Sequence, residues 1–179
     1  MPKYVALLRG INVGGKGIVK MSALKAAFEK LGYTDVATFI QSGNVLFSSA
    51  KKQQALAREI TAMLSKKFGL DSKVVILSAA DLETVVNKCP KGFGKKPDDY
   101  KYDIMFFVET VDSKKVLATL PLQEGVDAAY PGPNLLYFSR LRSQDSKSKL
   151  PKVISMPIYK SLTIRNWNTT VRLLALLEN

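Results

Sequence analysis

The order in which strand-like and helix-like apolar patterns follow one another restricts the fold more than any other feature of the sequence. Six such patterns alternate as strand, helix, strand, strand, helix, strand: residues 4–11, 23–31, the two runs of "VATFIQSGNVLFSS" around Gly43-Asn44, 49–68 and 73–77. The order β-α-β-β-α-β is that of the split βαβ unit found in ferredoxin-like folds. The sequence therefore predicts an antiparallel sheet covered by two helices over residues 1–78.

A second series of patterns begins after residue 101. It comprises a strand at 102–108, a short helix after Asp112, a hairpin of 125–130 and 134–140 around Pro131-Gly132-Pro133, and a C-terminal helix at 167–178. A helix with a Ser78–Asp81 capping box and a Gly- and Pro-containing loop join the two series. We predict an α+β fold of two ferredoxin-like (βαββαβ-type) units in tandem, with antiparallel sheets covered by helices. The predicted boundaries are 1–78 for the first half, 79–101 for the connecting helix and loop, and 102–179 for the second half.

Two residue types that carry much of protein chemistry are scarce here. The chain has no histidine and a single cysteine, Cys89. These counts exclude an internal disulfide, a multi-cysteine metal site and a histidine-based triad. We predict no metal and no cofactor, and we expect Cys89 to be buried and inert because it follows an apolar stripe. No pair of carboxylates shares a helical face by spacing, so catalytic residues are not assigned and enzymatic activity stays open.

The N-terminal apolar stretch is five residues long and stops at Arg9. It is too short for a signal peptide or a membrane span. Hydrophobic residues make up 46% of the chain, enough to bury a core. We expect a cytoplasmic protein that does not engage a membrane, and the sequence makes no prediction of its oligomeric state.

A glycine-rich loop follows the first predicted strand. Its segment G-I-N-V-G-G-K, ending at Lys16, fits seven positions of the phosphate-binding pattern GxxxxGK[ST], but Gly17 replaces the hydroxyl residue that would bind Mg²⁺. The helix also starts several residues too late, and the predicted sheet is not parallel, which excludes a Walker-type nucleotide triphosphatase. Two interpretations remain open. The loop is either a wide glycine turn or an amide-lined anion site to which Arg9, Asn12 and the loop lysines contribute.

Polar residues gather at two further places. Gln41, Ser42 and Asn44 lie at the predicted hairpin tip, where such residues are ordinary turn formers. The tip of this hairpin is not expected on the rim where the first strand ends, so contact with the glycine loop is left open.

The other cluster is "TIRNWNTTVRLL" at 163–174. Asn166 or Asn168 is expected to cap the last helix, and Trp167 is expected to pack on the core. Arg165 lies just before a helix N-terminus, where a cation is unfavourable. It is expected either to pair with a carboxylate or to point at a ligand.

The chain carries a formal net charge of +12. Such an excess attracts phosphate-bearing partners, although lysines also serve solubility. Between residues 140 and 165 there are seven basic residues and one acid, and candidate phosphate contacts within this segment are Arg140, Arg142, Lys147, Lys149 and Lys152. "KGFG" at 91–94 matches half of an RNA-recognition signature. The strand with stacking aromatics that should follow is missing, so we interpret the match as chance.

Two of these segments resemble the signatures of a bacterial family, the domain of unknown function 1697. "LLRGINVGGKGIVKMSALKAAFEKLGYTDVATFIQSGNVLF" is similar to its N-terminal signature, and "TIRNWNT" is similar to its C-terminal one. The resemblance implies an α+β fold of ferredoxin-like units, and it implies no substrate, cofactor or catalytic residue. The signature residues are mostly polar, basic or glycine, which is more typical of a site than of packing.

The leading hypothesis is the binding of a phosphate-bearing small molecule or other compact anion. The candidate ligand-binding residues are Arg9, Asn12, Gly14, Gly15, Lys16, Gln41, Ser42, Asn44, Arg165, Asn166 and Asn168. A nucleic-acid-binding module that uses the 140–165 segment is one alternative, and a protein-interaction domain without a small ligand is another.

Overall fold

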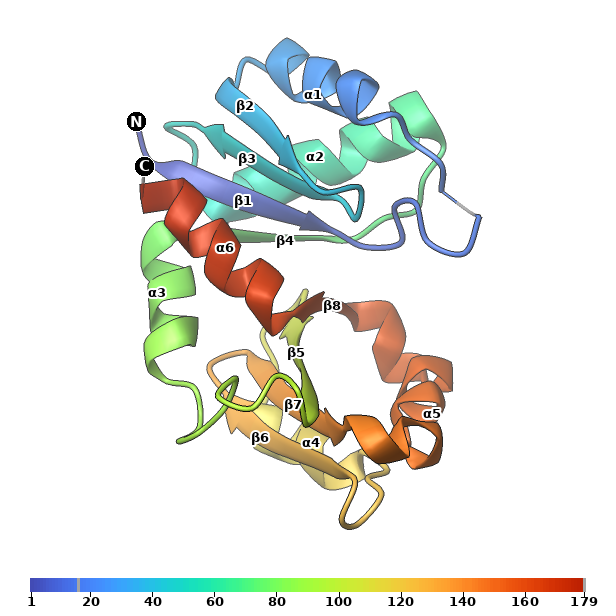
Figure 1. Cartoon of the computed structure of the whole chain (residues 1–179). Helices are drawn as coiled ribbons and strands as arrows, with labels where there is room; N and C mark the ends of the chain where they lie inside the picture. The colour runs from blue at the N-terminus through green and yellow to red at the C-terminus, as the bar shows by residue number, and fades with distance from the viewer. Residues whose placement is uncertain (16, 179) are drawn as a thin grey trace. The chain divides into compact units, whose positions relative to one another are not determined.

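The computed structural model describes residues 1–15 and 17–178 and divides the chain into two compact units (Figure 1). The first unit contains residues 1–82 together with those from 173 on, and the second contains residues 83–172. Each unit holds one four-stranded antiparallel sheet with helices, so the predicted α+β fold class is confirmed. Among the described residues, no helix has the length and apolar content needed to span a membrane.

The first unit follows the predicted order of elements. They are β1 (Lys3–Leu8), α1 (Met21–Lys30), β2 (Thr34–Phe39), β3 (Asn44–Ser48), α2 (Gln53–Phe68) and β4 (Val74–Ser78). The sheet order is β2-β3-β1-β4, and every neighbouring pair is antiparallel. The apolar stripes of both helices pack on one cluster, in which Leu24, Phe28, Leu56 and Ile60 are fully buried. The helical spacing of apolar residues in the sequence thus predicted the buried faces of both helices correctly.

The sheet order determines which loops share a rim. Because β3 lies between β1 and β2 and is antiparallel to both, β1 and β2 run in the same direction. Their C-terminal ends therefore lie on the same side of the sheet. The main-chain N–H of Leu8 donates to Gly43 O at 2.8 Å, across that rim. The expectation that the hairpin tip lies away from the end of the first strand was wrong.

The predicted capping box is confirmed at the start of α3 (Ala79–Asn87). The Asp81 carboxylate accepts from Ser78 N at 2.8 Å, and Asp81 N donates to Ser78 Oγ at 3.2 Å. This reciprocal pair satisfies two main-chain donors that a helix start otherwise leaves open.

The second unit contains one strand that the sequence did not predict. Its elements are β5 (Tyr100–Phe107), α4 (Ser113–Thr119), β6 (Asp127–Gly132), β7 (Leu135–Leu141), the 3-10 turn η1 (Arg142–Lys147), α5 (Leu150–Ser155), the 3-10 turn η2 (Pro157–Ser161) and β8 (Leu162–Asn166). α6 (Trp167–Glu178) follows. The sheet order β6-β7-β5-β8 repeats the order of the first unit. The β6–β7 hairpin also turns later than predicted, because Gly132 still pairs with Leu135.

The two faces of the second sheet differ in their covering. Alternate residues Met105, Phe107, Leu136 and Phe138 pack with residues of α5 and the α4 region. The intervening side chains of β5 and β7 face the other way, as the two-residue repeat of a strand requires. On that face the rings of Tyr102 and Tyr137 contact Phe93 of the loop before β5.

Candidate functional site

Three loops meet on one side of the first sheet, and we call them together the first-unit rim. They are the glycine loop (residues 9–20), the β2–β3 turn (residues 40–43) and the segment before β4 (residues 69–73). The Asn12 side-chain amide donates to Gln41 O at 3.0 Å, which ties the glycine loop to the turn. The Ser72 hydroxyl donates to Arg9 O at 2.6 Å, which ties it to the third segment. Two polar clusters that are 29 residues apart in the sequence are therefore joined.

Asn12 holds the glycine loop closed. Its Nδ2 donates to Val19 O and to Gln41 O, both at 3.0 Å, and its Oδ1 accepts from Val19 N at 2.8 Å. Its own N–H donates to Gly17 O at 3.0 Å, and its φ of 54° is in the left-handed region that Asn tolerates. Both amide hydrogens are already used, so Asn12 shapes the loop rather than offering donors to a ligand.

Asn44 and Gly43 close the neighbouring turn in the same manner. Asn44 is fully buried, and its Nδ2 donates to Phe39 O at 3.1 Å and to Ser42 Oγ at 3.0 Å. Gly43 has a φ of +73°, and a Cβ added there would lie 3.0 Å from Leu8 Cβ. Only glycine fits both the conformation and the space. The turn is thus a rigid wall of the rim.

The outer part of the glycine loop is open. Gly14 and Gly15 have φ values of +58° and +73°, and an added Cβ would meet nothing within 4 Å at either residue. Arg9 and Lys20 bring positive charge to the glycine loop and Lys73 brings it to the segment before β4, where Asp71 is the one acid of the three segments. Lys16, a predicted ligand-binding residue, lies outside the described residues. The exposed main chain and the surrounding cations suit a compact anion.

The rim also carries apolar and strained residues that sequence reasoning missed. Val13, Ile18 and Ile40 have 60%, 78% and 50% of their surface exposed. Ile40 has a φ of 50°, which is a genuine outlier for a β-branched residue. Such strain costs about 1–3 kcal/mol and is concentrated at functional sites. No local pattern in "FIQSG" signals it, because Ile is an ordinary strand residue.

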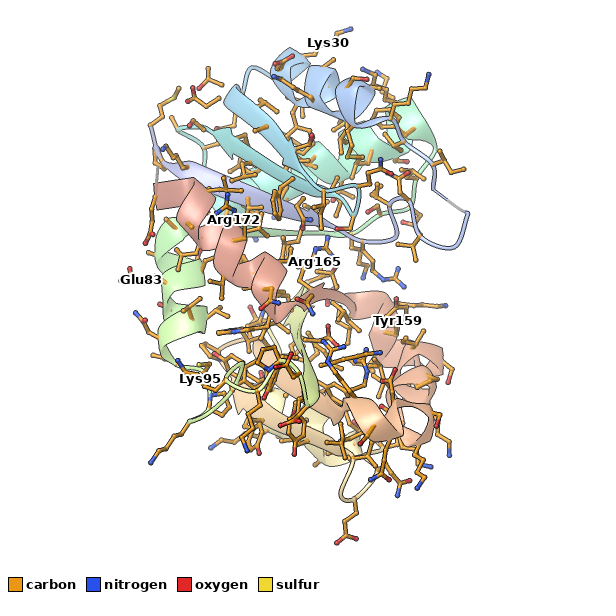
Figure 2. All side chains as sticks on the ribbon, in the orientation of Figure 1. Lys30, Glu83, Lys95, Tyr159, Arg165 and Arg172 are labelled. Atoms are coloured by element: carbon orange, nitrogen blue, oxygen red, sulfur yellow. The ribbon has the colours of Figure 1, made fainter. Side chains whose placement is uncertain are left out.

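Arg165 is a buried cation in the second unit. It lies in β8 just before α6 (Figure 2). Its Nη1 donates to Thr163 Oγ1 at 2.9 Å and to Ile164 O at 2.8 Å. Burial lowers the pKa of its guanidinium to about 10, while the nearby Tyr159 acts in the opposite direction. With 8% of its surface exposed, Arg165 serves mainly to hold the end of β8.

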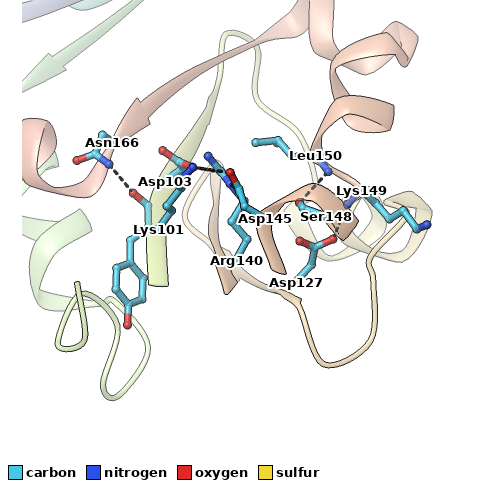
Figure 3. Close-up of polar contacts among 10 residues, drawn as sticks. Lys101, Asp103, Asp127, Arg140, Asp145, Ser148, Lys149, Leu150 and Asn166 are labelled. Atoms are coloured by element: carbon cyan, nitrogen blue, oxygen red, sulfur yellow. Dashed lines mark hydrogen bonds and ion pairs between the residues drawn. The ribbon is translucent and has the colours of Figure 1, made fainter. Parts of the chain in front are cut away.

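Asn166 is the residue that caps α6, which decides between the two predicted candidates. Its Oδ1 accepts from Asn168 N at 2.9 Å, and Thr170 Oγ1 donates to Asn166 O at 3.1 Å. Its Nδ2 donates to Tyr102 O at 3.2 Å, which fixes the cap to β5 (Figure 3). The side chain of Asn168 is exposed. Thr163, Arg165 and Asn166 therefore have clear structural roles.

The "KGFG" segment contacts Trp167, a relation that the sequence did not reveal. The Phe93 ring lies edge-on to the indole, with 5.2 Å between ring centroids. A Cβ added at Gly94 would overlap the indole Nε1, so this position has room only for glycine. The loop and the start of α6 thus form one packed unit over the sheet.

Arg140 is engaged in an ion-pair cluster and is not available to a phosphate. Its Nη1 contacts Asp103 at 2.6 Å, and its Nε contacts Asp145 at 2.7 Å. Lys101 also pairs with Asp145 (Figure 3). Burial raises the pKa of the Asp103 carboxyl, although Arg140 opposes this, and the hydrogen bond from Lys101 lowers the pKa of Asp145. These ion pairs occupy the Arg140 guanidinium and weaken the prediction that it contacts a nucleic acid.

Two other basic candidates, Arg142 and Lys147, are exposed. Arg142 is exposed, and its Nε donates to Pro97 O at 2.7 Å. The exposed Lys147 donates to Gln144 Oε1 at 3.0 Å. Cys89, which was expected to be buried, is half-buried and lies just beyond the end of α3 at Asn87.

Comparison with known proteins gives a family and a fold. The sequence model of the family described as "Protein of unknown function (DUF1697)" matches residues 1–137. No curated protein matches the sequence. Among solved structures, the conserved bacterial protein SP0830 from Streptococcus pneumoniae is 28% identical, with a TM-score of 0.86 and coverage of 98% of each chain.

Proposed function

Because the chain belongs to the family described as Protein of unknown function (DUF1697), whose description carries no activity, we propose a function from its own geometry. The first-unit rim binds a phosphate-bearing small molecule or another compact anion. The observation that carries this proposal is the exposed, left-handed main chain at Gly14 and Gly15, in a rim where two of the three converging loops carry basic residues. Successive main-chain N–H groups in such conformations form concave anion sites.

The rigidity of the rim supports the proposal further. Asn12 and Gly43 hold the two loops in one arrangement, so an anion would meet donors that are already ordered. Preorganised donors lose little conformational entropy on binding. Arg9, Lys16 and Lys20 would supply charge, and the side chains of Gln41 and Ser42 would supply polar contacts at the edge.

The second unit does not enter this proposal. Arg165 and Asn166 are held by their own hydrogen bonds, so the rim has to bind an anion without them. The rival function, nucleic-acid binding by the 140–165 segment, is weakened by the ion pairs of Arg140.

Glycine amides provide the direct test. Inorganic phosphate, sugar phosphates and nucleotides are titrated into ¹⁵N-labelled protein, and the amide resonances of Gly14 and Gly15 are followed. We expect saturable shifts at these residues and at Gly43. Unchanged resonances with all three ligand classes would contradict the proposal.

A matched pair of lysines isolates the contribution of charge. Lys20 directly precedes α1 beside the glycine loop, and Lys30 is the last residue of the same helix. The two residues are separated by the helix length of about 15 Å, roughly one and a half Debye lengths at ordinary salt. Lys20→Ala should weaken anion binding several-fold more than Lys30→Ala. Equal effects would mean that the overall positive charge of the protein, and not the position of Lys20, attracts the anion.

A further inference from the structure

We propose that the second unit binds an unpaired nucleobase of a single-stranded nucleic acid in a hollow on the face of its sheet that carries Tyr102 and Ser139. The hollow is lined by Pro90–Phe93 of the "KGFG" loop and by side chains of β5, β6 and β7. This proposal goes beyond the proposed anion function, because no residue of the first-unit rim takes part.

Strand register explains why the sheet is hollow at this place. Ser139 of β7 pairs with Tyr102 of β5 on one side and with Ala128 of β6 on the other. Two small side chains thus lie side by side and form the floor. One step along the same face, Tyr130 of β6 pairs with Tyr137 of β7. Large rings therefore surround a gap that small residues leave open.

The size and walls of the hollow suit one planar ring system. Its volume is about 210 Å³. Pockets for drug-sized ligands span roughly 300–1,000 Å³, so a single ring with its substituents is the appropriate occupant. Tyr100 and Tyr130 offer aromatic surfaces beside the buried Tyr102, and Ser139 offers a hydroxyl that can read the edge of a base. Base–aromatic stacking accepts any base because every base has a π-face.

The aromatic wall formed by Phe93 and Tyr102 is held in place by ring packing. The Phe93 ring lies edge-on to Tyr102 and Tyr137, with centroid distances of 4.8 and 5.4 Å. The buried Tyr137 hydroxyl donates to Val85 O at 2.8 Å. Tyr130, in contrast, keeps 46% of its surface exposed. An exposed tyrosine beside a rigid aromatic wall is a stacking partner available to a ligand.

Charge on the adjoining loop favours a ligand with phosphates. The loop carries Lys91, Lys95 and Lys96, all exposed, and Lys95 extends from it in Figure 2. Asp98 and Asp99 lie at its far end, after Pro97. Lysines beside an aromatic hollow reproduce the combination that single-strand-binding proteins use, in which cations track the backbone and rings stack on bases. Duplex bases are stacked inside the helix and cannot enter.

The structure also changes the interpretation of "KGFG". The aromatic strand that the RNA-recognition signature requires directly after the motif is replaced by Lys95-Lys96-Pro97-Asp98, and β5 begins only at Tyr100. In the folded chain, aromatic side chains on the sheet face come instead from β5 and β6, as Tyr100, Tyr102 and Tyr130. The motif is imperfect in sequence, yet the loop lies against a face with stacking aromatics.

The test measures binding of a fluorescent single-stranded thymidylate oligonucleotide of about ten nucleotides, within the site sizes of small domains. Three variants of the full chain are compared with the parent. Tyr130→Ala removes a wall and should weaken binding about tenfold, whereas Tyr130→Phe keeps the ring and should stay within about twofold. Ala128→Leu keeps every ring but fills the floor, and it should weaken binding as much as Tyr130→Ala.

Two controls separate base stacking from charge and from misfolding. Duplex DNA of equal length and inorganic polyphosphate should bind more weakly than the single strand. Trp167 emission reports whether the Phe93 loop keeps its packing in each variant. If Tyr130→Ala disturbs that emission, the oligonucleotide affinities of Ala128→Leu and Tyr130→Phe are compared instead. The proposal then requires Ala128→Leu to bind more weakly than Tyr130→Phe.

The proposal is overturned by any of three results. The parent protein does not bind the single strand at low salt, or Ala128→Leu binds like the parent, or polyphosphate binds as tightly as the oligonucleotide. None of these results bears on the glycine amides of the first unit, so the two proposals fail separately.

Discussion

Substituting Gly43 by alanine tests whether the close approach of two loops organises the first-unit rim. Gly43 and Gly15 share a φ of +73°, but their surroundings differ. A Cβ at Gly43 would lie 3.0 Å from Leu8 Cβ and 3.1 Å from Ile11 Cβ, whereas a Cβ at Gly15 would meet nothing within 4 Å. The pair therefore separates the cost of the backbone conformation from the cost of crowding.

The expected magnitudes follow from these two terms. A non-glycine residue in the left-handed region costs about 1–2 kcal/mol, and both variants carry this term. Crowding a packed site costs about 1–3 kcal/mol more, and only Gly43→Ala carries it. We expect the free energy of unfolding to fall by about 1–2 kcal/mol for Gly15→Ala and by about 2–5 kcal/mol for Gly43→Ala. The larger loss is a substantial part of the roughly 5–15 kcal/mol of a typical domain.

Urea denaturation followed by far-ultraviolet circular dichroism measures the difference, provided that the slope with denaturant is the same in both variants. Hydrogen exchange adds a local measurement at the Leu8 amide, which donates to Gly43 O. Its protection should fall in Gly43→Ala and stay unchanged in Gly15→Ala. Equal stability losses, or unchanged Leu8 protection, would refute the view that contact between Gly43 and β1 holds the rim together.

Three further predictions concern charge and strain. The hydrogen bond from Lys51 holds the pKa of Glu59 below its ordinary value of 4.5, so the stabilisation from Glu59 is present above that pH and is lost as pH falls through the lowered pKa. Urea titrations of Glu59→Gln should therefore show a weaker loss of stability in acid than the parent, and added salt should shrink the difference. Ile40→Asn, which relieves the left-handed strain, should raise the melting temperature with a gain of about 1 kcal/mol, and a lower melting temperature would contradict this. Arg140→Gln should lower the free energy of unfolding, measured in urea, by about 3 kcal/mol because the buried Asp103 carboxylate loses its ion-pair partner. Adding Asp103→Asn should restore part of this loss.

The first unit shows how much of the fold was accessible from the sequence. Apolar spacing within α1 and α2 is local, and so are the turn signals around Gly43, so element order and the buried stripes were correctly predicted. β8 was missed for the opposite reason. Its five residues include Arg165, and it is a strand because β5 offers it a pairing edge.

The candidate sites show the same division between local sequence information and long-range contacts. The sequence by itself determined which residues are polar, glycine or aromatic, and therefore that the glycine loop is not a Walker loop. Only the tertiary structure decided that Asn12 reaches Gln41, that Arg140 pairs with Asp103, and that Ser139 lies between Tyr102 and Ala128 on neighbouring strands. Each of these relations joins residues far apart in the chain. Local periodicity reports which face of an element is apolar, but strand order and register decide which side chains meet.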